Sequence, residues 1–206
     1  MKKTIRISAL LVLGAAVLPV WGQSAPTGAA PGKPVNFDLG LTYTAKVAKI
    51  SQQSSSNFVL NGASLDGVFW LKGKASLNGK LGVAFDIGGE TASNIEPGVN
   101  LTQFSTVAGP RYTVWTFNRT ANKPNVYVQA LGGFVSASNG VFVQAPNTTS
   151  RAQSLAVQTG GGLNWPINKK IGWRALEADF IYTQLGNNAN NIQNDLRLSS
   201  GVTLHF

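Results

Sequence analysis

Residues 194–206, with the sequence NDLRLSSGVTLHF, alternate between apolar and polar side chains at nearly every step. The even positions from 196 onward carry leucine, valine or phenylalanine except at Ser200, whereas Arg197 and small or polar residues occupy most odd positions. Successive side chains of a strand point to opposite faces of a sheet, so this stretch predicts a strand with one apolar and one polar face. Soluble sheets alternate too, and the meaning of the pattern therefore depends on the strand that pairs with it.

Residues 36–47 (NFDLGLTYTAKV) carry the same alternation at the other end of the patterned region. The odd positions from Phe37 to Val47 are apolar or aromatic, and the even positions are polar, charged or glycine. A tilted strand needs about ten residues to cross a bilayer, and both stretches are long enough. Within hydrocarbon every backbone donor and acceptor needs a protein partner, so a spanning sheet must close on itself. We therefore expect these first and last strands to pair and to join their apolar faces into one lipid-facing surface.

Six further strands are predicted between these two. Asn78-Gly79 is a strong hairpin signal, and Pro110 predicts a bulge or kink because proline cannot donate to a strand ladder. Short turns are expected after the second, fourth and sixth strands and longer polar loops after the others, as in barrels with periplasmic turns and outer loops. The sequence thus predicts an all-β fold, an eight-stranded antiparallel transmembrane β-barrel. The six strands are predicted at 67–77, 80–88, 103–117, 125–135, 154–165 and 171–184, and the longer loops at 51–63, 89–102, 136–153 and 185–193.

The polar faces of the predicted strands combine glycines with charges of both signs. The lumen of an eight-stranded barrel is narrow, so it accommodates small side chains and charged groups that pair with one another. We expect a charge network to fill the lumen, formed by Lys46, Lys72, Lys74, Asp86, Arg111, Glu177, Asp179 and Arg197. Arg174 has an even residue number, like the apolar residues that form the lipid-facing side of its predicted strand. We therefore expect its side chain to extend to the membrane interface beside Lys169 and Lys170.

A soluble lipocalin-like barrel is the alternative with the same strands but with the apolar face inside. The glycines of the polar faces disfavour it, because a soluble exterior has no need of so many small residues. Aromatic side chains also gather near strand ends, as in the interfacial girdles of membrane proteins. The predicted girdle residues are Tyr43, Phe69, Tyr112, Trp165, Trp173 and Tyr182.

Residues 1–22 are typical of a secretory signal peptide. Basic residues precede an apolar stretch that is too short to span a bilayer, and Gly22 provides a small residue before a cleavage site at Gln23. Residues 23–34 are rich in proline and small residues, which predicts a flexible lead-in. The predicted barrel domain then comprises residues 35–206.

The C-terminal sequence LRLSSGVTLHF is similar to the targeting signal of bacterial outer-membrane proteins, with Leu204 and Phe206 as its expected assembly residues. Residues 35–206 as a whole resemble the small outer-membrane barrels of the OmpA/OmpX type. The phrases AGPRYT (108–113) and TGGGLNWPI (159–167) are similar to forms found in uncharacterised members of that superfamily. The resemblance implies a bacterial outer-membrane location, with periplasmic chaperones and the barrel-assembly machinery as partners.

Composition narrows the possible chemistry. The chain has no cysteine, which excludes disulfides, thiolate metal sites and a thiol nucleophile, and we expect no metal and no cofactor. A basic balance of +9 can indicate nucleic acid. An exported protein has little access to nucleic acid, so we expect outer-membrane lipid and lipopolysaccharide as partners and no nucleic acid.

Three functions are compatible with such a barrel. We expect a structural or surface-interaction role through the outer loops, whose ligand the sequence does not identify. A narrow pore or a conduit for small or hydrophobic solutes is the alternative, which the filled lumen disfavours. A lipid A-modifying enzyme comes third, because it needs a base near a nucleophile at the outer leaflet. The one histidine, His205, is expected at the periplasmic rim, so we expect no enzyme.

Overall fold

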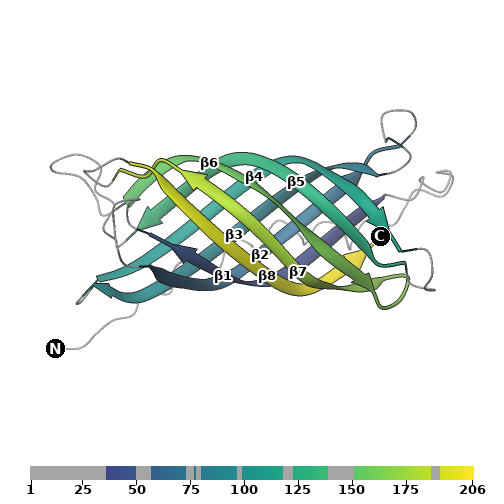
Figure 1. Ribbon diagram of the computed structural model, residues 1–206, viewed down its shortest axis with the longest axis horizontal. Coiled ribbons are helices and arrows are strands. Elements are labelled where there is room, and N and C mark those ends of the chain that lie inside the picture. The colour runs from purple at the N-terminus through teal and green to yellow at the C-terminus, as the bar shows by residue number, and fades with distance from the viewer. Residues whose placement is uncertain are drawn as a thin grey trace, which may run out of the picture. The chain divides into compact units, whose positions relative to one another are not determined.

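The chain folds into a closed barrel of eight antiparallel strands. The computed structural model describes residues 36–49, 57–72, 77, 80–96, 99–117, 123–138, 151–186 and 191–206. Each strand pairs with its neighbours in sequence, and β1 also pairs with β8, as the slanted ribbons of Figure 1 show. The strands are β1 (Phe37–Ala48), β2 (Phe58–Trp70), β3 (Leu81–Glu96), β4 (Val99–Thr116), β5 (Asn125–Ser138), β6 (Arg151–Pro166), β7 (Ile171–Thr183) and β8 (Gln193–His205).

This architecture confirms the predicted eight-stranded antiparallel barrel. Across the closing seam Leu39 pairs with Leu204, Leu41 with Val202, and Lys46 with Arg197. Paired residues of neighbouring strands point to the same face of a sheet, so the apolar positions of both strands lie together on one face. No helix among the described residues is long and apolar enough to span a membrane.

The apolar face of the sheet points outward. Leu41 is 63% exposed and Val202 is 51% exposed, whereas Asp86, Glu177 and Arg197 are buried inside the barrel. An apolar exterior around a polar, charged interior is the arrangement of a barrel that faces lipid. The lipocalin-like alternative would have the opposite arrangement, and the structure excludes it.

The barrel has two different ends, which we name by their connections. The turn end holds the connections 71–80, 117–124 and 167–170 together with Phe206. The loop end holds the connections 49–57, 97–98, 139–150 and 184–192. The expected contrast between short turns and long loops is therefore incomplete, because 71–80 is long and 97–98 is short.

Asn78 and Gly79, the predicted two-residue turn, lie outside the described residues, but the register of the strands on either side does not fit such a turn. Strand β2 already begins at Phe58 and ends at Trp70, and Phe69 pairs with Val83. A two-residue turn at 78–79 would pair even positions of one strand with odd positions of the other. The observed register keeps apolar positions opposite apolar positions, so the burial of one face decided the pairing against the local turn preference.

The long polar loop predicted at 89–102 is wrong. Strand β3 continues to Glu96 and β4 begins at Val99. The reason lies in the inward positions of this hairpin, where Ala92 and Leu101 are buried inside the barrel. Inward packing thus extends the two strands through a segment whose composition is typical of a loop.

The bulge expected at Pro110 lies elsewhere on β4. Ala108 pairs with Gly132 and Arg111 pairs with Gln129, which is one continuous register on either side of the proline. The register with β5 shifts only between Thr113 and Trp115. Pro110 lies at an outward position, exposed, and the ladder continues on both sides of it.

Candidate functional site

Arg197 on β8 is the centre of a charge network in the middle of the barrel. Its Nη2 atom lies 2.7 Å from Asp86 Oδ2 on β3 and 3.1 Å from Asp179 Oδ2 on β7. The Arg197 side chain is fully buried. A buried charge is strongly destabilising unless it is paired. The ion pairs with Asp86 and Asp179 are therefore needed to hold the arginine inside the barrel. They also join β3 to the opposite side of the barrel.

Asp66 on β2 is a second centre of the network. Its carboxylate oxygens lie 3.2 Å from Arg111 Nη1 and 2.5 Å from Arg174 Nη1. Arg174 also lies 3.3 Å from Glu177 Oε2, and the hydroxyl of Tyr127 donates to the same carboxylate. The Arg111 guanidinium lies over the Tyr127 ring, 4.4 Å from its centroid, where the ring face attracts a cation.

A third group of polar side chains lies nearer the loop end. Lys46 on β1 donates hydrogen bonds to Glu90 on β3 and to Gln103 Oε1 on β4, the latter at 2.6 Å. We call these three groups together the charged layer. With Asp195 of β8, it contains ten buried Asp, Glu, Lys and Arg side chains, of which six are carboxylates: Lys46, Asp66, Asp86, Glu90, Arg111, Arg174, Glu177, Asp179, Asp195 and Arg197.

Glycines of the wall leave room for these groups. A Cβ atom on Gly40 would lie 2.2 Å from Asp66 Oδ1, and one on Gly160 would lie 2.3 Å from Asp179 Oδ1. Both distances are far below van der Waals contact. At these two positions glycine is thus a steric requirement of the carboxylate beside it.

Most residues of the predicted charge network lie in the charged layer. These are Lys46, Asp86, Arg111, Glu177, Asp179 and Arg197. Lys72 does not, because β2 ends at Trp70 and Lys72 is exposed beyond the strand. Lys74 lies outside the described residues.

The expectation that Arg174 faces the membrane interface is wrong. The register between β7 and β8 shifts between Arg174 and Glu177. Because of this bulge, the side chains of β7 that point inward have even residue numbers before it and odd residue numbers after it. Arg174 is therefore buried in the charged layer together with Glu177. A switch of apolar parity, from Trp173 to Leu176, is the sequence signal that indicates such a bulge.

Several members of the charged layer were not predicted. Asp66 and Glu90 fall close to or inside the loops assigned from composition, and Asp195 lies at the start of the last strand. Tyr127 and Gln129 lie on the inward parity of β5, and Gln129 Oε1 accepts from Arg111 Nη2 at 2.6 Å. Extending the alternation of β2 and β3 across the assigned loops would have identified Asp66 and Glu90.

An apolar layer fills the barrel between the charged layer and the loop end. Its side chains point inward from six strands and from the segment after β7, and all are buried: Ala48, Leu60, Ala92, Leu101, Ala137, Ala152 and Leu185. Leu60 and Leu101 have no exposed surface at all. Toward the loop end, the interior is thus closed by hydrocarbon side chains.

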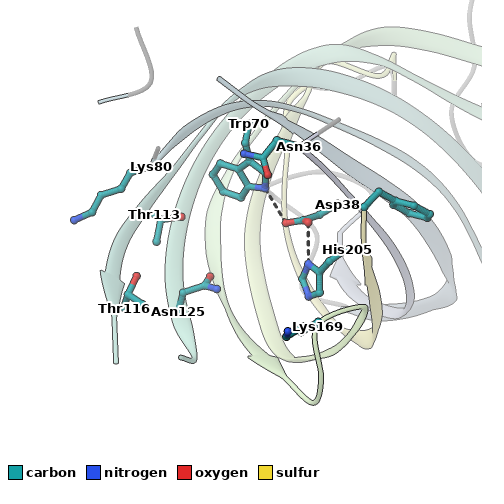
Figure 2. A pocket seen from close by; sticks show the side chains of 10 residues that line it. Asn36, Asp38, Trp70, Lys80, Thr113, Thr116, Asn125, Lys169 and His205 are labelled. Carbon is teal, nitrogen blue, oxygen red and sulfur yellow. Dashed lines mark hydrogen bonds and ion pairs between the residues drawn. The ribbon is translucent and has the colours of Figure 1, made fainter. Parts of the chain in front are cut away.

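The turn end opens into a polar vestibule of about 580 Å³. Figure 2 shows that Asp38 lies between His205 and Trp70 there. Asp38 Oδ1 lies 2.8 Å from His205 Nδ1, and Asp38 Oδ2 accepts from Trp70 Nε1 at 2.7 Å. His205 thus lies at the rim of the turn end. Among the described residues no cluster of His, Cys, Asp or Glu side chains is arranged to hold a metal.

The predicted girdle residues fall at both ends of the wall. Trp165 pairs with Trp173 beside the 167–170 turn, and Phe69 stacks on Phe37 with ring centroids 4.4 Å apart. Tyr112 also lies toward the turn end. Tyr43 and Tyr182 lie toward the loop end, where the Tyr43 hydroxyl donates to Asn61 Oδ1 at 2.7 Å. Their role at the water interface stays a prediction.

The expected assembly residues lie on the outer surface of the seam. Leu204 pairs with both Leu39 and Ile171. The Phe206 backbone N–H donates to the Phe37 carbonyl at 2.9 Å, and the two rings stack at 6.1 Å. Recognition of this segment during assembly stays a prediction. The cleavage site at Gly22 and Gln23 lies outside the described residues.

The fold is similar to that of solved outer-membrane proteins. No protein-family model matches the chain, and no curated protein matches it. Ail, the attachment invasion locus protein of Yersinia pestis, is similar with a TM-score of 0.50 and 12% identity, over 84% of this chain and 100% of that chain. The N-terminal β-barrel domain of Pseudomonas aeruginosa OprF gives 0.43 and 14% over the same shares. At these identities the likeness to Ail concerns the fold alone. The chain thus shares with Ail the fold of a closed eight-stranded antiparallel β-barrel.

Proposed function

We propose that the protein is a closed membrane anchor that presents its loop-end connections at the bacterial surface. The observation that carries this proposal is the filling of the interior by two successive layers, one charged and one apolar. Eight strands normally leave an interior just large enough for side chains. Both layers here are built from buried side chains that reach inward from the wall.

The two layers oppose conduction by different means. The charged layer blocks the lumen with ion pairs such as Arg197 with Asp86, at 2.7 Å, which ions would have to break. The apolar layer lines the lumen with hydrocarbon side chains, and hydrocarbon constrictions exclude water. A pore would require both layers to rearrange, and a structural role requires neither to do so.

The ends of the barrel differ in what they offer to a partner. The loop-end connections 139–150 and 184–192 contain no charged residue and are rich in Asn, Gln, Ser and Thr. Such segments suit adaptable hydrogen bonding at a surface. The histidine lies at the opposite end, so an imidazole-dependent reaction on outer-leaflet lipid has no support from its position.

Planar-bilayer recordings test the closed lumen. We expect the purified protein to give no sustained single-channel openings. A variant in which Leu60 and Leu101 are both replaced by glycine removes two of the three fully buried leucines of the apolar layer, and we expect it to stay closed as well because the charged layer is intact. Sustained openings of the unchanged protein would favour the pore instead.

Single-cysteine labelling tests the orientation, since the chain has no cysteine of its own. We expect Asn147→Cys, in the 139–150 connection, to react with a membrane-impermeant maleimide on intact cells. Ser76→Cys, in the 71–80 connection, should react only after the cells are permeabilised. The reverse result would place the turn end outside and contradict the proposed presentation.

A further inference from the structure

Basic residues gather at the turn end of the barrel. The connections there contain these basic residues and no acidic one: Lys72, Lys74, Lys80, Arg119, Lys123, Lys169 and Lys170. The loop-end connections contain only Lys49. Six of the eight Asp and Glu residues are buried in the charged layer and are screened from this surface by the wall. The turn end is therefore the strongly cationic end of the molecule.

A groove of about 470 Å³ lies at this end beside the last residues of β4. It is lined by Lys80, Val114, Trp115, Thr116 and Lys123. Trp115 is 61% exposed, and its ring meets Phe117 edge-on with centroids 6.5 Å apart. The groove thus combines an exposed apolar floor with two lysines and a hydroxyl.

The backbone of β4 fixes the positions of both lysines. The Thr113 N–H donates to the Lys80 carbonyl at 2.8 Å, and the Phe117 N–H donates to the Pro124 carbonyl, next to Lys123, at 2.8 Å. Between these two bonds the β4 register shifts, at the bulge between Thr113 and Trp115. The bulge interrupts the alternation, so that Val114 and Trp115 are both exposed. The apolar floor of the groove and the positions of the lysines beside it therefore both follow from this bulge in β4.

Lys80 borders both the vestibule and the groove. Figure 2 shows its ammonium group pointing outward, away from Asp38 and His205. Asp38, the acidic residue that lines the vestibule, is engaged with His205 and Trp70. The cationic group therefore serves the outer wall, where lipid head groups lie, and not the interior.

We propose that this groove binds an anionic phospholipid, with the phosphodiester between Lys80 and Lys123 and an acyl chain along Val114 and Trp115. The chemistry of the four side chains matches that of the two parts of such a lipid. Tryptophan is favoured at the head-group level, and lysines near a membrane surface attract anionic lipid. Thr116 supplies a hydroxyl donor for a phosphate oxygen. The site goes beyond the anchor role, because neither closure of the lumen nor presentation of the loop end requires it.

Native mass spectrometry of the purified protein tests the site. The protein is mixed in detergent with equal amounts of dioleoylphosphatidylglycerol and dioleoylphosphatidylcholine, and the ratio of the two bound lipids is measured. We expect the unchanged protein to prefer phosphatidylglycerol and the double variant Lys80→Gln/Lys123→Gln to lower that preference roughly tenfold. Trp115→Ala should weaken binding of both lipids.

A matched control variant distinguishes lipid binding in the groove from general attraction by the positive charge of the turn end. Lys169→Gln/Lys170→Gln removes the same charge at the same end, outside the groove, and should leave the preference within about twofold of the original. Heat-modifiability on a gel checks that each variant is folded. The proposal fails if the control lowers the preference as much as the groove variant, or if the unchanged protein binds both lipids equally.

A third arm distinguishes the lipid from a free phosphate. Glycerol phosphate is added as a competitor, and we expect no displacement of phosphatidylglycerol at equal concentration because the acyl contacts are missing. Displacement would identify a soluble phosphate ester as the ligand and overturn the lipid site. Neither bilayer conductance nor surface labelling depends on these outcomes, so the anchor role stands or fails separately.

Discussion

Arg174 on β7 reaches across the interior to Asp66 on β2, with 2.5 Å between Nη1 and Oδ1. The two residues are 108 positions apart in the sequence. Asp66 also holds Arg111 at 3.2 Å, so one carboxylate joins three strands of the wall. Asp66 is therefore the nearest carboxylate to both Arg111 and Arg174, ahead of Glu177 at 3.7 and 3.3 Å.

Replacing Asp66 should cost more stability than replacing Asp179. Asp66→Asn leaves two buried arginines to share Glu177, and removing one partner of a buried pair costs about 3–5 kcal/mol. After Asp179→Asn, Arg197 keeps Asp86 at 2.7 Å, and the layer still has more carboxylates than cations. We expect Asp179→Asn to lower the free energy of unfolding by less than half as much as Asp66→Asn does. Urea unfolding in micelles, followed by tryptophan fluorescence, measures both free energies of unfolding. Equal decreases in the two variants would contradict a central role for Asp66 in the charged layer.

Arg174→Leu tests the bulge on β7. If Arg174 faced lipid, leucine would be harmless or stabilising there. Because it lies in the charged layer, leucine should lower the free energy of unfolding by about 3 kcal/mol or more, since Asp66 loses its nearest partner. Phe180→Leu, an exposed position of the same strand, is the control and should change little. A stable Arg174→Leu protein would place the side chain outside.

Gly40→Ala and Gly132→Ala test the steric requirement of the carboxylates. The new methyl at position 40 would lie 2.2 Å from Asp66 Oδ1, which two arginines hold in place, so we expect a loss of about 1–3 kcal/mol. A methyl group on Gly132 would meet no atom within 4 Å beyond its chain neighbours, and alanine should be neutral there or stabilise by up to about 1 kcal/mol. Thermal unfolding of the two variants gives the comparison. Similar thermal midpoints for the two variants would show that the strands near Asp66 can shift to make room for the added methyl group.

Strand parity was the most predictable property of this chain. A period of two places Lys46, Asp86 and Arg197 on one face whatever the details of the loops, because a slip by one residue would expose them to lipid. The closing pair of strands followed from the same pattern. Six of the eight predicted network residues are buried in the charged layer, and Lys74 lies outside the described residues.

Bulges and strand lengths were not predictable from parity. Arg174 changed face because one irregularity reversed the pattern within its strand. Glu90 lies in a segment with the composition of a loop, and its strand continues because Ala92 and Leu101 pack inside the barrel. Partners such as Asp66 and Arg174 depend on the stagger of strands around the closed wall, which no local pattern specifies.

The burial of six acidic side chains has a consequence for the chain before and after it folds. In the unfolded polypeptide, acidic and basic groups are interspersed and partly screen one another. Folding withdraws most of the acids, together with four basic partners, into the interior, and leaves described basic residues such as Lys72, Lys169 and Lys170 exposed. Insertion therefore buries two more carboxylates than cations, and the finished barrel meets its surroundings with a larger excess of positive charge than its amino-acid composition suggests.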